Sequence, residues 1–254
     1  MAFLGKLFEK KECAICNGEI GLLGNRKLED GNMCKHCAQK LSPWFDDRRH
    51  STVAQIEEQL AYREANKEEV AKFNTTRVYG EWTKIYLDED ADKFMVTDAG
   101  SKKEIENANP DVVPFSKVTG CEVDIDENRI ELKKTDKDGN SVSYIPPKYE
   151  YEYNFYIVIR VSHPYFDEIR VKMNNSSVDV QVTGAQRPTT SAKYQQYKQT
   201  CEEIKATLLK ERQESRAVAA KTAAKTAVTC PNCGATTIPD AAGRCEYCGG
   251  TVRN

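Results

Sequence analysis

Apolar and polar positions alternate with a period of two through residues 77–184, and this pattern predicts a β-rich middle domain. Clusters of Asp, Asn, Gly and Pro separate the alternating runs, as expected of turns between strands. About seven strands are predicted in this way: Trp82–Leu87, Phe94–Thr97, Val118–Ile125, Arg129–Lys133, Tyr153–Val161, Ile169–Met173 and Val178–Val182.

Two segments have helical spacing instead. Thr52 and Gln55 form a possible capping box, which predicts a helical stretch that continues to Phe73. Because Asn66 and Glu69 repeat the cap signature, this stretch is either one kinked helix or two. Its many Glu and Lys residues favour a solvated helix that bridges two modules. An amphipathic helix is predicted over residues 191–212, where the apolar positions are Tyr194, Tyr197, Cys201, Ile204 and Leu208.

A mostly antiparallel set of strands followed by a C-terminal helix resembles the layout of pleckstrin-homology-like domains, in which a helix caps a β-barrel. A β-sandwich or another α+β domain is the alternative. After Arg216 the chain becomes rich in Ala, Lys and Thr, which indicates a linker, helical or frayed. The expected fold class is α+β, with these divisions: a finger at 1–50, a helical connection at 51–76, the β-rich domain with its helix at 77–212, the linker at 213–229 and a zinc ribbon at 230–254.

Composition narrows the class of protein. The 254 residues are 30% charged with a net charge of −2, and no run of about 18 apolar residues occurs, so we expect no membrane span. Charged residues interrupt the first eleven positions too early for a signal peptide, and the expected location is therefore the cytoplasm. The near-zero net charge gives no whole-protein argument for nucleic-acid binding, although residues 186–229 are locally basic.

Cysteine spacing carries the clearest chemical signal. Eight of the ten cysteines form Cys-x-x-Cys pairs, arranged as one quartet near each end of the chain. We expect two structural zinc ions per chain, each held by four thiolates in a tetrahedron. The expected ligands are Cys13, Cys16, Cys34 and Cys37 for the first ion, and Cys230, Cys233, Cys245 and Cys248 for the second.

A two-residue gap suits this chemistry because a tight turn directs both sulfur atoms toward one ion at about 2.3 Å. Asn17-Gly18, Gly234 and Gly249 follow three of the pairs and supply the positive φ angles that such turns need. A disulfide framework and rubredoxin-type iron are the alternatives. The unpaired Cys121 and Cys201 fall on apolar faces of a predicted strand and helix, which indicates core positions.

The first quartet also has a recognisable context. Short apolar runs on both sides of Gly24-Asn25 predict a hairpin, and Cys34 to Leu41 predicts a first helical turn. The tight turn at Cys13 and Cys16, the hairpin, and the second cysteine pair at the start of a helix together resemble a treble-clef zinc finger. The cysteine spacing alone also permits a zinc ribbon.

Residues 13–31, continuing through residues 41–52, resemble an uncharacterised bacterial family with an N-terminal four-cysteine finger domain of unknown function. Similar proteins carry a β-rich middle and a terminal zinc ribbon, which residues 230–234 and 245–249 resemble. The resemblance implies structural zinc on the eight paired cysteines and a bacterial cytoplasm, and it implies no activity.

No phosphate-binding loop, dinucleotide motif, serine elbow or His-Glu-x-x-His motif occurs, so we expect a non-catalytic protein without a small-molecule substrate. Cys121, His163 and Asp167 have the side chains of a thiol triad, but their strand and turn contexts argue against one. The first hypothesis is an adaptor that binds other proteins through exposed side chains at the two zinc modules: Leu22, Leu23, Trp44, Phe45 and Tyr247.

Two other functions remain open. Nucleic-acid binding is the main alternative, because Arg48-Arg49-His50 follows the aromatic pair Trp44-Phe45, although Asp46 and Asp47 offset that charge. Membrane-surface attachment through the basic late helix or the pleckstrin-like domain is the second.

Overall fold

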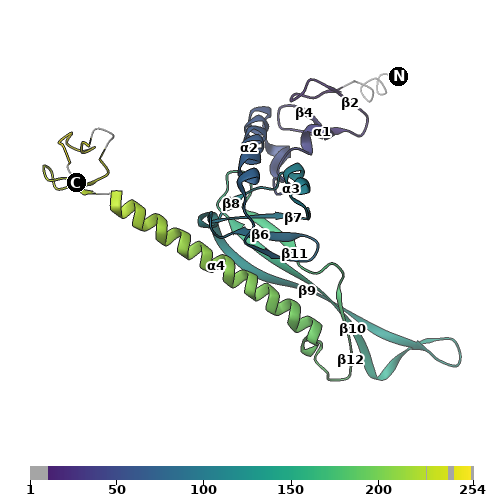
Figure 1. The fold of residues 1–254 in the computed structure, drawn as a ribbon. Coiled ribbons are helices and arrows are strands. Elements are labelled where there is room, and N and C mark those ends of the chain that lie inside the picture. The colour runs from purple at the N-terminus through teal and green to yellow at the C-terminus, as the bar shows by residue number, and fades with distance from the viewer. Residues whose placement is uncertain (1–10, 227, 240–242, 253–254) are drawn as a thin grey trace, which may run out of the picture.

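The computed structural model describes residues 11–226, 228–239 and 243–252. An N-terminal cysteine-containing finger lies beside helix α2, two β-sheets follow, and the long helix α4 leads to a second small cysteine-containing module (Figure 1). The helices are α1 (Lys35–Ala38), α2 (Val53–Lys72), α3 (Lys102–Ala108) and α4 (Ala192–Thr226). The strands of the finger are β1 (Lys11–Glu12), β2 (Glu19–Ile20), β3 (Asn25–Lys27) and β4 (Asn32–Cys34), and those of the second module are β13 (Val228–Thr229) and β14 (Thr236–Thr237).

The middle of the chain contains two four-stranded antiparallel sheets. The first has the order β5-β6-β7-β8, and in the second β10 pairs with β9 on one side and with β11 and β12 on the other. All strand pairings described between residues 77 and 184 stay within one of these sheets, so the expected closed barrel does not form. The strands are β5 (Arg77–Tyr79), β6 (Lys84–Asp88), β7 (Lys93–Thr97), β8 (Val113–Pro114), β9 (Val118–Thr135), β10 (Ser141–Val161), β11 (Glu168–Lys172) and β12 (Val178–Thr183).

The main core lies between the two sheets and α4. Ile85 and Phe94 of the first sheet, Phe155 and Ile157 of the second, and Ile204 of α4 are all fully buried in one cluster. The opposite face of the first sheet is also covered, because Tyr86 and Met95 pack with Val70 of α2. A sheet buried on both faces explains why β6 and β7 contain nearly continuous apolar runs.

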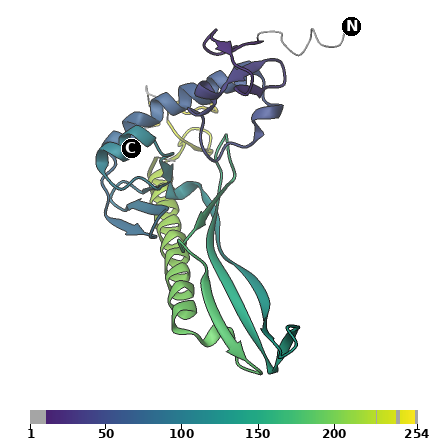
Figure 2. The ribbon, with the colours of Figure 1, turned by 90° about the vertical axis from the view of Figure 1, so that its right-hand side faces the viewer.

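Strands β9 and β10 form one long hairpin that projects beyond the rest of the fold (Figures 1 and 2). The turn predicted at residues 126–128 is not present, because β9 continues without a break from Val118 to Thr135. Its polar side chains are satisfied across the sheet: the Asn128 side chain donates to Glu152 (3.0 Å), and Asp126 pairs with Arg170 (3.6 Å). A polar segment therefore forms a strand here because its neighbours supply partners.

Asn174 closes the gap between β11 and β12 along the edge of β10. Its side chain accepts a hydrogen bond from the Phe155 amide (2.8 Å) and donates to the carbonyl oxygens of Tyr153 (3.1 Å) and Ser176 (2.7 Å). This buried amide thereby replaces the missing strand pairing, as buried backbone groups require.

Helix α2 is a single helix from Val53 to Lys72, and its N-terminal capping box of Thr52 and Gln55 is confirmed. The second cap signature is not a cap, because Asn66 lies inside the helix and is buried. The helix is also not the solvated bridge that its composition predicts. Its buried positions follow helical spacing and are largely polar: Ile56, Gln59, Arg63, Asn66 and Val70.

Two of these polar residues, Arg63 and Asn66, join α2 to the loop before β8. Arg63 donates to the buried carboxylate of Asp111 (2.9 Å), whose second oxygen accepts from the hydroxyl of Ser42 (2.8 Å). The Asn66 side chain donates to Asn109 (2.8 Å) and accepts from the Val112 amide (3.0 Å). Through Ser42, this buried network connects the finger, α2 and the first sheet.

Helix α4 continues through residue 226, so most of the predicted linker is helical. Tyr194, Ile204 and Leu208 pack into the main core as the apolar pattern predicts. Beyond Leu208, polar contacts replace apolar ones: Arg212 donates to the Thr119 carbonyl (3.0 Å), and Arg216 donates to the Val118 carbonyl (3.0 Å). The apolar residues of the first half of α4 are therefore part of the core, whereas Val218 further along is 58% exposed.

Candidate metal centres

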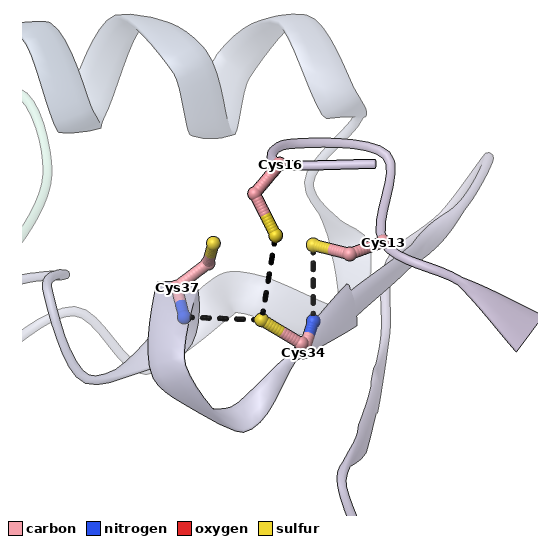
Figure 3. A group of neighbouring side chains, drawn as sticks. All are labelled: Cys13, Cys16, Cys34 and Cys37. Atoms are coloured by element: carbon pink, nitrogen blue, oxygen red, sulfur yellow. Dashed lines mark hydrogen bonds between the residues drawn. The ribbon is translucent and has the colours of Figure 1, made fainter. Parts of the chain in front are cut away.

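The first four-cysteine group is assembled from three elements of the finger (Figure 3). Cys13 and Cys16 lie in the turn between β1 and β2, Cys34 ends β4, and Cys37 lies in α1. Their four Sγ atoms all lie within 4.8 Å of one another. Cys13 and Cys37 are buried, whereas Cys16 is exposed.

Each half of this group has its own local geometry. In the first half, the Cys13 amide donates to the Gly18 carbonyl (2.9 Å), the Asn17 amide donates back to Cys13 (2.8 Å), and Asn17 has a φ of 55°. In the second half, Cys34 is the N-cap of α1, and its sulfur accepts from the Cys37 amide (3.3 Å). One pair is therefore held by a tight turn and the other by a helix start.

The predicted hairpin around Gly24-Asn25 is shifted. The paired strands are β3 and β4, and the turn is closed by the Leu28 amide, which donates to the Gly31 carbonyl (2.9 Å). Strand β2 pairs with the preceding strand β1 and not with β3. This pairing closes the Cys13 turn and buries Ile20 in the finger core.

The second group consists of two tight turns. The Cys230 amide donates to the Ala235 carbonyl (2.8 Å), and the Cys245 amide donates to the Gly250 carbonyl (2.8 Å). Gly234 and Gly249 have φ angles of 73° and 68°, as their positions predict. Both turns repeat the geometry at Cys13, and the four sulfur atoms again lie within 4.8 Å of one another: Cys230, Cys233, Cys245 and Cys248.

The sulfur spacing tests whether these groups fit a metal ion. Four thiolates placed tetrahedrally at about 2.3 Å from one ion are about 3.8 Å apart. The Sγ atoms of Cys16 and Cys34 are 3.8 Å apart, and the pairs Cys230–Cys248 and Cys233–Cys245 are 3.5 and 3.7 Å apart. Both groups can therefore each hold one metal ion, and an all-thiolate tetrahedron is the donor set that zinc favours.

Backbone amides favour a thiolate at one position of each group, whereas burial and the neighbouring sulfur atoms raise the pKa of Cys37. Although burial raises the pKa of Cys13, the amides of Cys34, Cys16 and Ile15 lower it to about 6. In the second group burial again opposes ionisation, and the amides of Cys248 and Tyr247 help to lower the pKa of Cys245 to about 6. In each group one sulfur therefore ionises readily, as a metal ligand must.

The other predicted surface residues divide into two sets. Leu22 and Leu23 are 86% and 92% exposed, and Tyr247 is 70% exposed, as predicted. Trp44 and Phe45 were predicted to be exposed but are partly buried. Trp44 packs against the main core, and Phe45 packs on the finger core, so both help to attach the finger.

Three cationic side chains of the finger line a cavity of about 290 Å³: Arg26, Lys35 and Arg48. Arg48 is fixed there by donation to the Lys27 carbonyl (2.5 Å), and burial and the neighbouring Arg26 and Arg49 lower its pKa. The basic run after Trp44-Phe45 pointed to Arg48, whereas no sequence motif pointed to Arg26 or Lys35. These two residues lie on β3 and α1, and only the folding of the finger brings them beside Arg48.

Cys121, His163 and Asp167 do not form a catalytic constellation. Burial raises the pKa of Cys121 to about 12, and the thiol faces the main core. His163 instead shares a hydrogen bond with the Tyr62 hydroxyl (3.0 Å), and its ring stacks on Phe166. Cys201 is fully buried in the same core as Cys121.

The fold and the two cysteine groups define a mixed α/β protein with a metal-binding module near each end. Residues 11–59 match a family model described as a domain of unknown function, DUF4428. None of the curated proteins and none of the solved structures matches the chain. Among the described residues, no helix combines the length and the apolar character needed to cross a membrane.

Proposed function

We propose that this protein is a non-catalytic, zinc-binding adaptor of the cytoplasm that binds other proteins. Zinc held by four thiolates has no coordination position left for a substrate, which supports a structural role for both ions. On this proposal the N-terminal finger is of the treble-clef type and the C-terminal module is a zinc ribbon. Each module then holds a small surface rigid for a partner.

The observation that carries this proposal is the exposure of Leu22 and Leu23 in the loop between β2 and β3. Two adjacent leucines that are almost entirely exposed cost solvation free energy unless a partner covers them. The loop is held at its two ends by the Cys13 turn and by the β3–β4 hairpin. A rigid apolar loop of this kind loses little conformational entropy on binding.

A pull-down with the full-length protein from native cytosol tests the proposal. The Leu22→Ser/Leu23→Ser variant should lose partners that the unchanged protein retains after nuclease treatment, while its metal content stays the same. Ile145→Ser is the matched control, because Ile145 is also almost fully exposed (96%) but lies on β10, outside both cysteine modules. Equal retention by all three proteins would contradict the proposal.

Nucleic-acid binding is the second candidate, supported by the cationic cavity of Arg26, Lys35 and Arg48. Three cations around one hollow can contact phosphate oxygens, and such contacts weaken steeply with salt. Salt-sensitive binding of RNA or DNA by the purified protein, abolished by Arg26→Ala/Lys35→Ala, would favour this candidate over the adaptor. A membrane role through α4 has no comparable support, since the predicted apolar residues Tyr194, Ile204 and Leu208 are buried in the core.

A further inference from the structure

The outer edge of β9 has no strand partner in the described part of the chain. Strand β10 pairs with β9 on one side and with β11 and β12 on the other, whereas β9 pairs only with β10. The distal part of the β9–β10 hairpin also projects beyond β12 and α4 (Figure 1). A free edge of this length offers a row of backbone donors and acceptors to another strand.

The direction of these backbone groups follows from Phe155. Its amide does not donate to β9, because it donates to the Asn174 side chain (2.8 Å), and its carbonyl accepts from the Met173 amide (2.8 Å). Both groups of Phe155 therefore point away from β9. In an antiparallel pair the opposite residue, Ile125, then points its own amide and carbonyl to the free edge. By alternation, Glu127, Arg129, Glu131 and Lys133 do the same.

Charge is distributed unevenly along this edge. Asp126 and Glu127 lie toward the body of the fold, while Arg129, Lys133 and Lys134 lie toward the tip. The residues opposite the outer charges on β10 are uncharged: Tyr151 faces Arg129, Tyr149 faces Glu131, Ser143 faces Lys133 and Val142 faces Lys134. In the described part of the chain, Arg129, Glu131 and Lys133 form no ion pair. Arg129 lies over the Tyr149 ring (5.1 Å to its centroid), a contact that leaves its charge unneutralised.

An antiparallel copy of the same strand complements this pattern in one register. When Ile130 faces Ile130 of a second copy, Arg129 faces Glu131, Glu127 faces Lys133 and Asp126 faces Lys134. Each pairing occurs twice because the arrangement is two-fold symmetric. The register also places outward-facing backbone groups of one copy opposite outward-facing groups of the other, as a hydrogen-bonded ladder requires.

Neighbouring registers are unfavourable. A shift that centres the pair on Arg129 brings Arg129 against Arg129 and Glu127 against Glu131. A shift that centres it on Glu131 brings Glu131 against Glu131 and Arg129 against Lys133. Like charges directly opposite each other destabilise a strand pair, so the charges select the register centred on Ile130.

We propose that two copies of this chain pair edge to edge through residues 125–135 of β9 and form one continuous antiparallel sheet across a two-fold axis at Ile130. Arg212 and Arg216 of α4 bind the carbonyls of Thr119 and Val118, at the other end of β9 from the tip of the hairpin. The 40% exposed side chain of Ile130 gains an apolar contact with its counterpart at the axis. This inference is independent of the proposed adaptor function.

Charge exchange on the full-length, zinc-loaded protein tests the pairing. Sedimentation at micromolar concentration should give twice the 28.7 kDa chain mass. Arg129→Glu should weaken the dimer by about tenfold to a hundredfold, since two attractive pairs become repulsive. Glu131→Arg should do the same, and the double variant Arg129→Glu/Glu131→Arg should restore the dimer. Lys103→Glu on α3, also an exposed charge reversal, should leave it unchanged.

Cysteine substitution tests the register. Ile130 faces itself in a non-hydrogen-bonded pair, where Cα atoms are about 4.5 Å apart, within disulfide range. Mild oxidation of Ile130→Cys should therefore link two chains, while Asn128→Cys, about 14 Å from its counterpart in this register, should link no more than the unchanged protein. A monomer at micromolar concentration, a double variant that stays monomeric, or linkage through Asn128→Cys would each overturn the proposal.

Discussion

The two cysteine modules share their ligands but differ in how they are attached to the rest of the molecule. The core around Cys13 includes Ile56 of α2, and the finger also contacts the main body through Trp44 and Ser42. The cluster around Cys230 contains residues of its own module alone: Cys230, Cys245, Val252 and Val228. The same coordination chemistry can therefore support a whole domain in one place and only a few residues in another.

Size explains the consequence of this difference. A module with three buried apolar residues in its described part cannot offset the entropy of ordering its chain, so its metal must supply nearly all of its folding free energy. In the finger, packing against α2 supplies part of the folding free energy. Because this packing is shared, unfolding of the finger also removes apolar contacts from α2. We therefore expect loss of the first metal ion to lower the stability of the main body of the protein. Loss of the second metal ion should unfold the C-terminal module alone.

The largest expected effect comes from removing a ligand. Cys16→Ser and Cys233→Ser should each remove one of two zinc ions, with a local loss on the order of 10 kcal/mol. Cys16→Ser should also lower the main thermal transition, whereas Cys233→Ser should leave it in place. Elemental analysis and calorimetry measure both results. Equal shifts of the main transition in the two variants would contradict the comparison.

An intermediate effect is expected at the joint between α2 and the first sheet. Arg63→Met leaves the carboxylate of Asp111, which is 2% exposed, without its charged partner and should cost about 3–5 kcal/mol in the free energy of unfolding. Lys67→Met, one turn further along α2, breaks an exposed pair with Glu64 and should cost about 1 kcal/mol or less. Urea unfolding of both variants compares them.

The double variant Arg63→Met/Asp111→Asn is the control for this experiment. It removes both charges and should recover part of the lost stability. A similar small cost for Arg63→Met and Lys67→Met would mean that the buried pair does not hold the finger to the body. The joint also crosses the predicted division at residue 77, because Arg63 lies before it and Asp111 after it.

The smallest effect concerns His163, at the second contact between α2 and the body. Burial lowers the pKa of His163. The negative charge of Asp111 raises this pKa, and the positive charge of Lys117 lowers it further. The two tyrosines that face the ring, Tyr62 and Tyr165, are neutral below pH 9. The unfolded chain therefore binds a proton more readily than the folded one. Stability should be complete above pH 6.5, the unfolded pKa, and should fall as the pH drops toward the folded value.

His163→Gln keeps a hydrogen-bonding side chain and should flatten this dependence between pH 7 and 5. Unfolding in urea at several pH values measures it. An unchanged slope in the variant would assign the pH dependence to other groups.

Local signals were sufficient for much of this protein. The spacing of the paired cysteines identified the residues that come together in the structure, and the residues after them identified turns with positive φ at Asn17, Gly234 and Gly249. The sequence also predicted the N-terminal cap of α2 and the buried apolar positions of α4. Each of these features depends on residues within a few positions of one another.

Tertiary structure decided the features that depend on distant residues. The polar segment 126–128 became strand rather than turn because Glu152 and Arg170 satisfy it. Arg63 of α2 is buried because Asp111 supplies its charge partner, and Phe45 packs edge-on against Tyr165. The continuation of α4 likewise relies on carbonyls of β9. Turns, helix caps and Cys-x-x-Cys pairs depend on neighbouring residues, so the sequence alone predicts them. The burial of a polar side chain depends on the hydrogen-bond or charge partner that folding brings to it.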